Sequence, residues 1–438
     1  MDPLGAIFAF LTLIVFLCSG VFSFEYLKGS KNIKSYAVFY VITMAVELLL
    51  CAASNLITFY MCYELLTIMS MPLVIHERTA QSKAAALKYL FFSMFGAYFA
   101  LFGIYNLSKK ATSLSFVYGG NIDASVWVAD EKILLISVMA MIIGFGVKAG
   151  MWPMHSWLPA AHPVAPSPAS AVLSACVVKA GVLGIIRSIW YVAGTGKIPG
   201  SYVQKAWMIL TLMTVFLGSM LAYREQVLKK RLAYSTVSQV SYILFGLAVG
   251  IGSVHTDSMV SSYAYVSDSI TGAILHVLAH GFIKAVLFLV AGAAMRYMNV
   301  HKVDELKGIG LKMPGIMVCY TIASLGLIGI PPTGGFVSKW YLATGSIATG
   351  IPVFSWLGPV VLLVSALLTA GYLLGPAVKA FFPGREYRQD HKDDKPLGKD
   401  EKPGLLMLLP VATLTLLSVL MGIFTSPIIE VIRKIFFI

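Results

Sequence analysis

Charged residues are scarce in this chain of 438 residues, of which only 12% are Asp, Glu, Lys or Arg. Soluble globular domains carry about 25% charged residues, roughly twice as many. Hydrophobic residues make up 58% of the chain, and its mean hydropathy is +0.81. This balance excludes a soluble globular protein, because most side chains must be surrounded by lipid or by one another.

Cysteine is also rare, and the sequence contains no C-x-x-C pair. Iron–sulfur clusters and structural zinc sites usually need clustered thiolates, so we expect no cofactor and no metal. A cleavable signal peptide is not expected either, since Met1-Asp2 lacks a basic n-region and the first apolar segment is too long. The five cysteines are scattered, at Cys18, Cys51, Cys62, Cys176 and Cys319.

Long hydrophobic runs, in contrast, recur along the whole chain. Runs of about 18 to 25 residues can cross a hydrocarbon core of roughly 30 Å as helices. The sequence therefore predicts an all-α membrane protein with about 12 transmembrane helices. The runs lie near residues 3–24, 35–53, 54–76, 82–107, 131–160, 167–193, 203–222, 233–251, 264–298, 314–348, 356–382 and 405–425.

The net charge of +13 does not indicate nucleic-acid binding, because the basic residues lie between the hydrophobic runs and not on one domain. They are also distributed unevenly, with 19 after the odd-numbered runs and seven on the other side. The positive-inside rule places the richer side in the cytoplasm. We therefore expect a multi-pass protein of the inner (cytoplasmic) membrane, with both termini outside and the polar loop 383–404 cytoplasmic. The richer set contains six basic residues of that loop and Lys28, Lys31, Lys34, Arg78, Lys83, Arg224, Lys229, Lys230, Arg231, Arg296, Lys302, Lys307 and Lys312.

Some charges fall inside the hydrophobic runs. Lys88, Arg187 and Lys379 lie near helix ends, from which their side chains can extend to the interface. One charge at a helix centre costs about 2.5–3.5 kcal/mol, so six unpaired charges would cost on the order of 15–20 kcal/mol. Such groups must pair, contact trapped water or change protonation state. The six deep charges are Glu47, Glu64, Lys148, Lys179, Lys284 and Lys339.

The run 264–298 carries polar residues every four positions, with His276, His280 and Lys284 on one helix face. Steps of four residues drift only about 40° around a helix and rise about 6 Å each. Three interpretations fit this stripe: a polar seam against another helix, a zinc-binding histidine pair, or a proton relay. The relay fits best, because histidine titrates near neutrality and one water can bridge each step. Asp268 lies on the same register and is an accessory candidate.

Two runs are interrupted by proline and glycine, each close to a lysine. Pro153 follows Lys148 in the first, and the stretch 331–335 precedes Lys339 in the second. Proline in a membrane helix frees backbone carbonyls, which is tolerated only against a cavity or another helix. Transporters often place ion sites at such breaks in repeated halves. The predicted divisions are 1–34 as an N-terminal helix and basic loop, 35–193 and 203–382 as two five-helix halves, 194–202 as a linker, 383–404 as a polar loop, and 405–438 as a C-terminal helix and tail.

Several of these stretches resemble one family, the antiporter-like subunits of respiratory complex I, Mrp-type cation/proton antiporters and group 4 membrane-bound hydrogenases. The similarity covers about residues 1 to 382 and several independent motifs in the same order. The motifs are NLITFYMCYELL (55–66), VKAGMWPMHSWLPAAHPVAPSPASAVL (147–173), KRLAYSTVSQVSY (230–242), HVLAHGFIKAVLFLVAG (276–292) and GIPPTGGFVSKWYL (329–342).

The resemblance implies a bundle of about fourteen helices with two inverted five-helix repeats, each containing a broken helix. It also implies roles for individual residues. Glu64 matches the glutamate that modulates a lysine, Lys148 matches that lysine, and Lys179 matches the connecting lysine of the next helix.

The stripe formed by His276, His280 and Lys284 matches the family's central relay, and Lys339 matches the terminal residue of the second broken helix. Relative to the family, we expect two N-terminal helices to be supplied by a separate small subunit. We also expect no long lateral helix of the kind found in the distal complex I subunit.

Glu47 belongs to no transferred motif, so a structural pair and an accessory relay both remain open for it. His155, in the first broken segment, is a further accessory candidate.

The resulting hypothesis is a subunit that moves H⁺, with Na⁺ as an alternative cargo, through a buried Lys/Glu/His relay. The chain has no expected redox centre, so the driving energy must come from other membrane subunits and a soluble redox module. Two alternatives stay open. One is a self-contained cation/proton antiporter or channel. The other is a haem-bearing, cytochrome-b-like electron carrier with axial ligands from His155, His162, His276 or His280.

Overall fold

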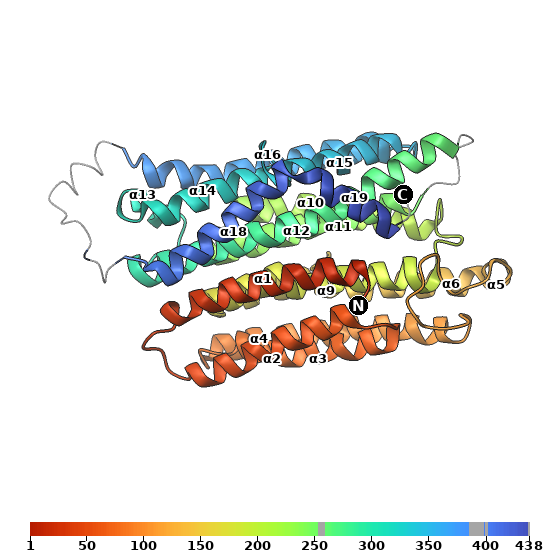
Figure 1. Ribbon diagram of the computed structural model, residues 1–438, viewed down its shortest axis with the longest axis horizontal. Helices are drawn as coiled ribbons and strands as arrows, with labels where there is room; N and C mark the ends of the chain where they lie inside the picture. Colours follow the sequence, from red (N-terminus) through yellow and green to blue (C-terminus); the bar gives the residue numbers. More distant parts are fainter. Residues whose placement is uncertain (253–258, 385–397, 399–401, 437–438) are drawn as a thin grey trace.

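The computed structural model describes residues 1–252, 259–384, 398 and 402–436, and side chains are described outside 259–267. Within these ranges the chain is helical, with two isolated bridges and no strand (Figure 1). The predicted all-α class is confirmed. The helices are α1 Pro3–Tyr26, α2 Ile33–Ala52, α3 Leu56–Val74, α4 Ala80–Ser108, α5 Ala124–Ala129, α6 Glu131–Ala149, η1 Met154–Trp157, α7 Leu158–Val164, α8 Ser167–Val172, η2 Leu173–Val177, α9 Val178–Ile186, η3 Arg187–Ala193, α10 Tyr202–Arg224, α11 Leu228–Gly250, α12 Met259–Met298, η4 Asp304–Leu306, α13 Ile309–Lys312, α14 Pro314–Ile328, α15 Gly334–Ala348, α16 Phe354–Phe381, α18 Leu405–Ile423 and α19 Thr425–Phe436.

Ten helical segments in the described part of the chain are long and apolar enough to cross a membrane. The other two predicted runs, 131–160 and 314–348, correspond to helices that are interrupted, α6 and the pair α14 and α15. Interruption shortens the continuous helix, and α6 also carries three charged residues. The ten spans, together with α6 and the pair α14 and α15, account for the twelve predicted runs.

Polar residues define where several peripheral helices begin. Asn55 and Thr79 accept hydrogen bonds through their side chains from backbone N–H groups of α3 and α4, at 2.8 and 3.0 Å. Asp2 does the same for Gly5 in the first turn of α1, at 2.9 Å. These caps satisfy N–H groups that a helix cannot pair internally.

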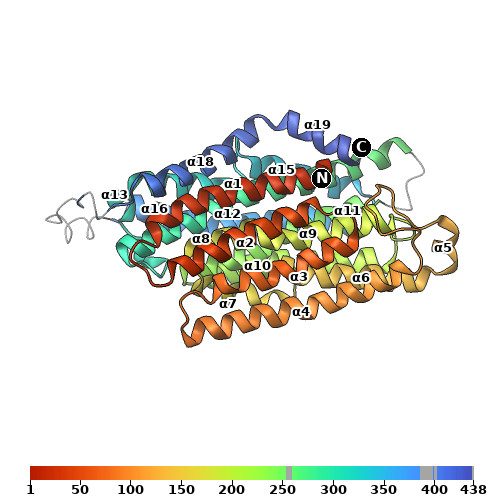
Figure 2. The same cartoon turned by 60° about the horizontal axis from the view of Figure 1, so that its bottom comes forward.

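Three segments form the interior of the bundle: residues 167–193, α11 and the part of α12 from Asp268 onward (Figure 2). Their side chains are almost entirely enclosed by protein, whereas the other spans are buried over only about half their residues or less. Enclosed helices can carry charged and polar groups because those groups do not face lipid. The predicted relay lysines and histidines at 179, 276, 280 and 284 all lie on these interior segments.

Both predicted helix breaks are present, and each begins with a glycine in the left-handed region. Helix α6 ends before Gly150, whose φ is 80°, and α14 ends before Gly329, whose φ is 96°. Glycine adopts this conformation without the strain imposed by a Cβ atom, so it can terminate a helix sharply. The two broken helices are thus confirmed, while the division into two inverted five-helix halves stays a prediction.

The chain enters and leaves the bundle at the same end, because α1 begins and α19 ends toward the right of Figure 1. This arrangement agrees with an even number of crossings. The side of the membrane on which that end lies stays a prediction from the basic loops.

Three basic residues lie elsewhere than the sequence predicts. Arg187 is not exposed at a helix end, because its side chain is fully buried in η3. Lys229 and Arg231, predicted in a loop, are buried in the first turn of α11. The prediction was wrong because the helix continues into the polar flank of its hydrophobic run, where the neighbouring helices supply backbone carbonyl groups as hydrogen-bond acceptors.

Candidate functional site

Lys148 lies in the last turn of α6 and is completely buried. Its ammonium donates to the carbonyl oxygen of Tyr63 at 2.8 Å and to Oγ1 of Thr67 at 2.7 Å. It also lies 3.7 Å from the centre of the Tyr63 ring. Lys148 lies beside the first helix break, as predicted, and both of its acceptors come from α3.

Glu64 directly follows Tyr63 and approaches Lys148 without reaching it. Glu64 and Lys148, both in the described part of the chain, form no ion pair. The buried Oε1 of Glu64 has no hydrogen-bond partner. The charge of Glu64 nevertheless acts on Lys148. A carboxylate 4 Å from an ammonium interacts with it by about 4 kcal/mol at an effective dielectric of 20. Small movements of Glu64 can therefore change how firmly Lys148 holds its proton.

Glu47, on α2, is a second buried carboxylate beside the same lysine. Its side chain is 3% exposed, and Oε2 has no hydrogen-bond partner. Lys148 and Lys179 are the two lysines that interact electrostatically with Glu47. Burying a carboxylate without a partner costs free energy, which a purely structural role would not offset. The burial of Glu47 therefore favours an accessory relay.

Lys179 lies at the start of α9, next to a π-helical turn. Its ammonium donates to the carbonyl oxygens of Ala175 and Ser174, at 2.6 and 3.3 Å, which both belong to η2. A π-helical turn leaves carbonyl groups outside the usual i to i−4 ladder, and such turns occur frequently at functional sites. The backbone irregularity thus supplies the acceptors that a buried ammonium needs.

The stripe on α12 is buried along its full length, as the spacing of its residues predicts. His276 contacts Oγ of Ser338 through Nδ1 at 2.9 Å and Oε1 of Gln239 through Nε2 at 3.2 Å. Its ring stacks on that of His280 with centroids 6.0 Å apart, and both ring nitrogens of His280 lack a partner. Lys284 ends the stripe.

The Lys284 ammonium binds neutral groups of α11 and no carboxylate. It donates to the carbonyl oxygen of Leu232 at 2.9 Å and to Oγ of Ser235. Among the described residues, no carboxylate charge acts on Lys284 or on Lys339. The ammonium groups of Lys284 and Lys339 donate hydrogen bonds to carbonyl and hydroxyl oxygens, and that of Lys339 also lies 4.9 Å from the centre of the Tyr242 ring.

Lys339 lies just after the second break and binds the helix end that the break exposes. Its ammonium donates to the carbonyl oxygens of Leu327 and Ile328, at 2.5 and 3.1 Å, at the C-terminus of α14. The partial negative charge of a helix C-terminus favours a cation there. The preceding residue, Ser338, contacts His276, so Lys339 adjoins the histidine stripe.

The main candidates on α9 and α12 are buried in the interior segments, whereas two accessory candidates lie elsewhere. Lys179 interacts electrostatically with Lys284 and with both stripe histidines. Asp268 instead lies near the surface, 3.9 Å from Arg433 and 3.2 Å from Oγ1 of Thr344. His155 is half-buried and interacts with the charge of Lys88, which lies outside the interior segments.

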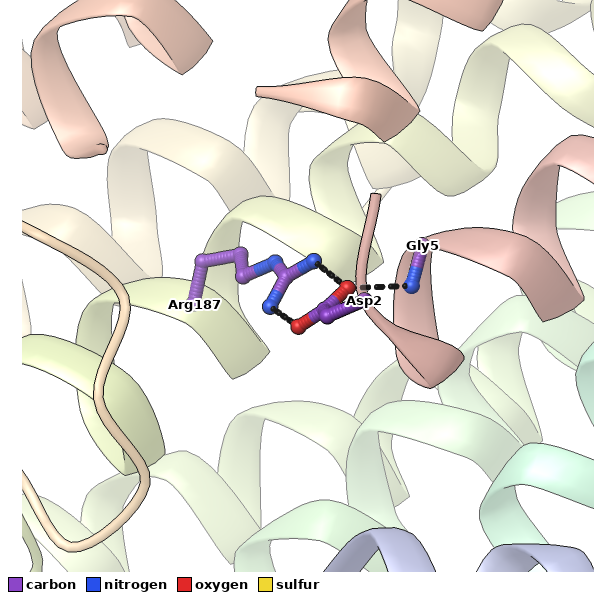
Figure 3. A network of polar contacts seen from close by, with 3 residues as sticks. All are labelled: Asp2, Gly5 and Arg187. Carbon is purple, nitrogen blue, oxygen red and sulfur yellow. Dashed lines mark hydrogen bonds and ion pairs between the residues drawn. The ribbon is translucent and has the colours of Figure 1, made fainter. Parts of the chain in front are cut away.

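Sequence reasoning missed one buried ion pair. Arg187 forms two hydrogen bonds with the carboxylate of Asp2, which also caps α1 through Gly5 (Figure 3). The guanidinium lies 4.6 and 4.7 Å from the ring centres of Phe116 and Tyr191. No local signal could reveal this pair, because its members are 185 positions apart.

Metal or haem ligation requires a free ring nitrogen on the histidine. Both ring nitrogens of His276 contact protein groups, and its ring is stacked beside that of His280 and does not face it across a gap. In the part of the chain described, no group of three or more His, Cys, Asp or Glu side chains could hold a metal ion.

A membrane-spanning bundle whose enclosed helices carry lysines and histidines, with glutamates on the adjoining helices α2 and α3, defines a polytopic protein organised around buried titratable groups. Residues 53–369 match the family described as "NADH:quinone oxidoreductase/Mrp antiporter, TM". The chain belongs to this family of antiporter-like membrane subunits.

Two relatives and one solved structure illustrate the similarity. NADH-quinone oxidoreductase subunit N of Desulforudis audaxviator is 30% identical over 98% of this chain and 82% of its own length. Hydrogenase-4 component B of Escherichia coli is 32% identical over 78% of this chain but only 50% of its own length. A subunit of the archaeal membrane-bound sulfane sulfur reductase shares the fold, with a TM-score of 0.82 at 19% identity over 99% of this chain and 81% of its own.

Proposed function

We propose that this subunit moves protons across the membrane through a relay that runs from Glu64 and Lys148 to Lys339. One observation carries the proposal. Six titratable side chains are buried in the bundle, two more are partly buried, and polar atoms of Glu47, Glu64 and His280 have no hydrogen-bond partner. In order, the relay comprises Glu64, Lys148, Glu47, Lys179, Lys284, His280, His276 and Lys339.

Each lysine can release a proton because neutral groups hold its amine in place. Carbonyl and hydroxyl oxygens accept hydrogen bonds from the ammonium without fixing its charge, unlike a carboxylate in direct contact. The two glutamates beside Lys148 then decide how firmly the first proton is held. Conformational or electrostatic change in a neighbouring subunit would shift Glu64 and start transfer. Na⁺ is the alternative cargo.

The energy for transfer would come from partners of this chain. Its relatives carry the names of respiratory and hydrogenase subunits, and the solved neighbour is part of a respiratory membrane complex. We therefore place the chain in the inner membrane, among other membrane subunits and with a soluble redox module on the cytoplasmic side. The two five-helix halves, 35–193 and 203–382, would carry proton uptake and release.

A self-contained antiporter is the second candidate, and family membership supports it less. Ion transport by the purified chain alone in liposomes would favour it. Proton movement only in the assembled complex would favour the subunit role.

Replacement of the two relay glutamates tests the proposal. We expect Glu64→Gln to lower proton pumping by at least about tenfold, since a modulating charge supplies a few kcal/mol. Glu47→Gln should lower it less, because Glu64 remains beside Lys148. Pumping is measured as the pH change in vesicles per turnover of the assembled complex.

Glu131→Gln is the matched control, because Glu131 is an exposed acid in the first turn of α6. It should pump like the unmodified protein. Wild-type pumping by an assembled Glu64→Gln complex would contradict the assigned role of Glu64.

A further inference from the structure

His162 is a buried histidine that the relay described above does not use. It lies on α7, within the first broken segment, and its side chain is fully enclosed. Neither ring nitrogen has a hydrogen-bond partner. A buried polar group without a partner costs about 1–3 kcal/mol, so a histidine kept at such a position calls for a physical reason.

The position of His162 extends the stripe on α12. Its ring stacks on Phe288, with centroids 4.7 Å apart and planes inclined by 26°. Phe288 lies four residues after Lys284, at the next step of the same face. Helix α12 therefore carries a phenylalanine where the polar stripe would continue, and α7 places an imidazole over that phenylalanine.

The next titratable group outward is Lys229, in the first turn of α11. Its ammonium donates to the carbonyl oxygens of Ala165 and Pro163, just after His162 in the chain. Lys284 donates to Leu232, which is three residues after Lys229 on the same helix. Lys229, on α11, thus binds the segment beside His162. Lys284 binds α11 three residues further along the helix.

Contacts connect both lysines to His162. Lys229 binds the carbonyl groups of Pro163 and Ala165, one and three residues after His162, and Lys284 lies four residues before Phe288, on which the His162 ring stacks. Glu77, an exposed residue between α3 and α4, interacts electrostatically with Lys229. His162 is thus adjacent both to the groups that Lys229 binds and to the end of the stripe at Lys284.

We propose that His162 and Lys229 form a proton-uptake branch that delivers protons from the surface near Glu77 to Lys284. This proposal rests on the relay function proposed above. It names the residues through which protons reach the stripe of His276, His280 and Lys284. In each step Lys229 gives one proton to a free ring nitrogen of His162, and the imidazolium gives one proton from its other nitrogen to the neutral amine of Lys284. Water can bridge each gap. One proton enters and one leaves, so His162 returns to its starting charge.

The variant His162→Gln tests the branch in the complete complex, since glutamine keeps polar atoms but cannot carry a proton. General acid–base groups contribute about 100-fold or more to proton-transfer rates, so we expect pumping per turnover to fall by at least about tenfold. The rate of the remaining pumping should show a larger solvent deuterium isotope effect, because proton transfer then limits it. His301→Gln, at an exposed histidine outside the bundle, is the matched control.

Lys229→Arg is the second variant and decides the matter if His162→Gln does not assemble. Arginine retains the charge and the donors to Ala165 and Pro163 but does not release a proton. We expect the same loss of pumping and the same larger isotope effect. Wild-type pumping in either assembled variant would overturn the branch.

Lys148→Ala separates failure of the branch from failure of the relay. If that variant stops pumping while His162→Gln and Lys229→Arg pump normally, the relay holds and the branch is wrong. If Lys148→Ala pumps normally as well, the proposed function itself is wrong.

Discussion

The variant Lys148→Ala should stop proton pumping by the assembled complex, with a fall of at least about 100-fold, as expected when a group that carries the proton is removed. Lys148 is fully buried, and its ammonium has two fixed acceptors on α3. The variant removes the cation that Glu64 and Glu47 both face, so the first step of transfer has no carrier. The readout is the pH change in membrane vesicles during turnover of the complex.

Lys148→Arg distinguishes proton release from charge alone. Arginine keeps a positive charge but stays protonated in proteins, so this variant should also fail to pump. Assembly, followed by native electrophoresis, should be retained in the arginine variant. An assembled Lys148→Arg complex that pumps normally would show that the residue acts only as a fixed charge.

The variant Arg187→Ala should have the largest effect on stability. Breaking a buried ion pair typically costs about 3–5 kcal/mol, but Asp2 is 32% exposed, so we expect about 2–3 kcal/mol. The loss would include the contacts of the guanidinium with Phe116 and Tyr191. The free energy of unfolding of the purified chain in detergent measures it.

A surface ion pair provides the matched control. Lys110 and Asp130 are 2.7 Å apart, with 36% and 30% of their side chains exposed, so Lys110→Ala should cost less than about 1 kcal/mol. Equal losses in the two variants would contradict a special role for the buried pair. A double-mutant cycle with Asp2→Ala isolates the pairwise contribution.

The Arg187 pair should also make stability depend on pH. Burial by itself raises the pKa of the Asp2 carboxyl, but the hydrogen bonds from Arg187 and the Gly5 N–H outweigh it and hold that pKa below its usual 3.8. A carboxyl with a lowered pKa in the folded state contributes its stability above its ordinary pKa. That contribution should be present at neutral pH and disappear as the pH falls through the lowered pKa, and Asp2→Asn should remove the dependence.

Much of the site followed from local patterns in the sequence. The stripe of His276, His280 and Lys284 depends only on helical periodicity, and the structure buries all three on one helix. The breaks after residues 149 and 328 follow from glycine and proline, whose backbone preferences act within a few residues. Distant partners were not predictable in this way, and neither were the π-helical carbonyls that hold Lys179.

The sequence by itself determined a helical membrane protein of this family, with buried lysines, glutamates and histidines near two broken helices, because hydropathy and helix-breaking residues are local properties. The tertiary structure alone decided which of these groups meet. It separated Glu64 from direct contact with Lys148, buried Glu47 with no hydrogen-bond partner for Oε2, and joined Arg187 to Asp2. Such contacts depend on how helices far apart in the chain pack against one another, and no short stretch of residues encodes that packing.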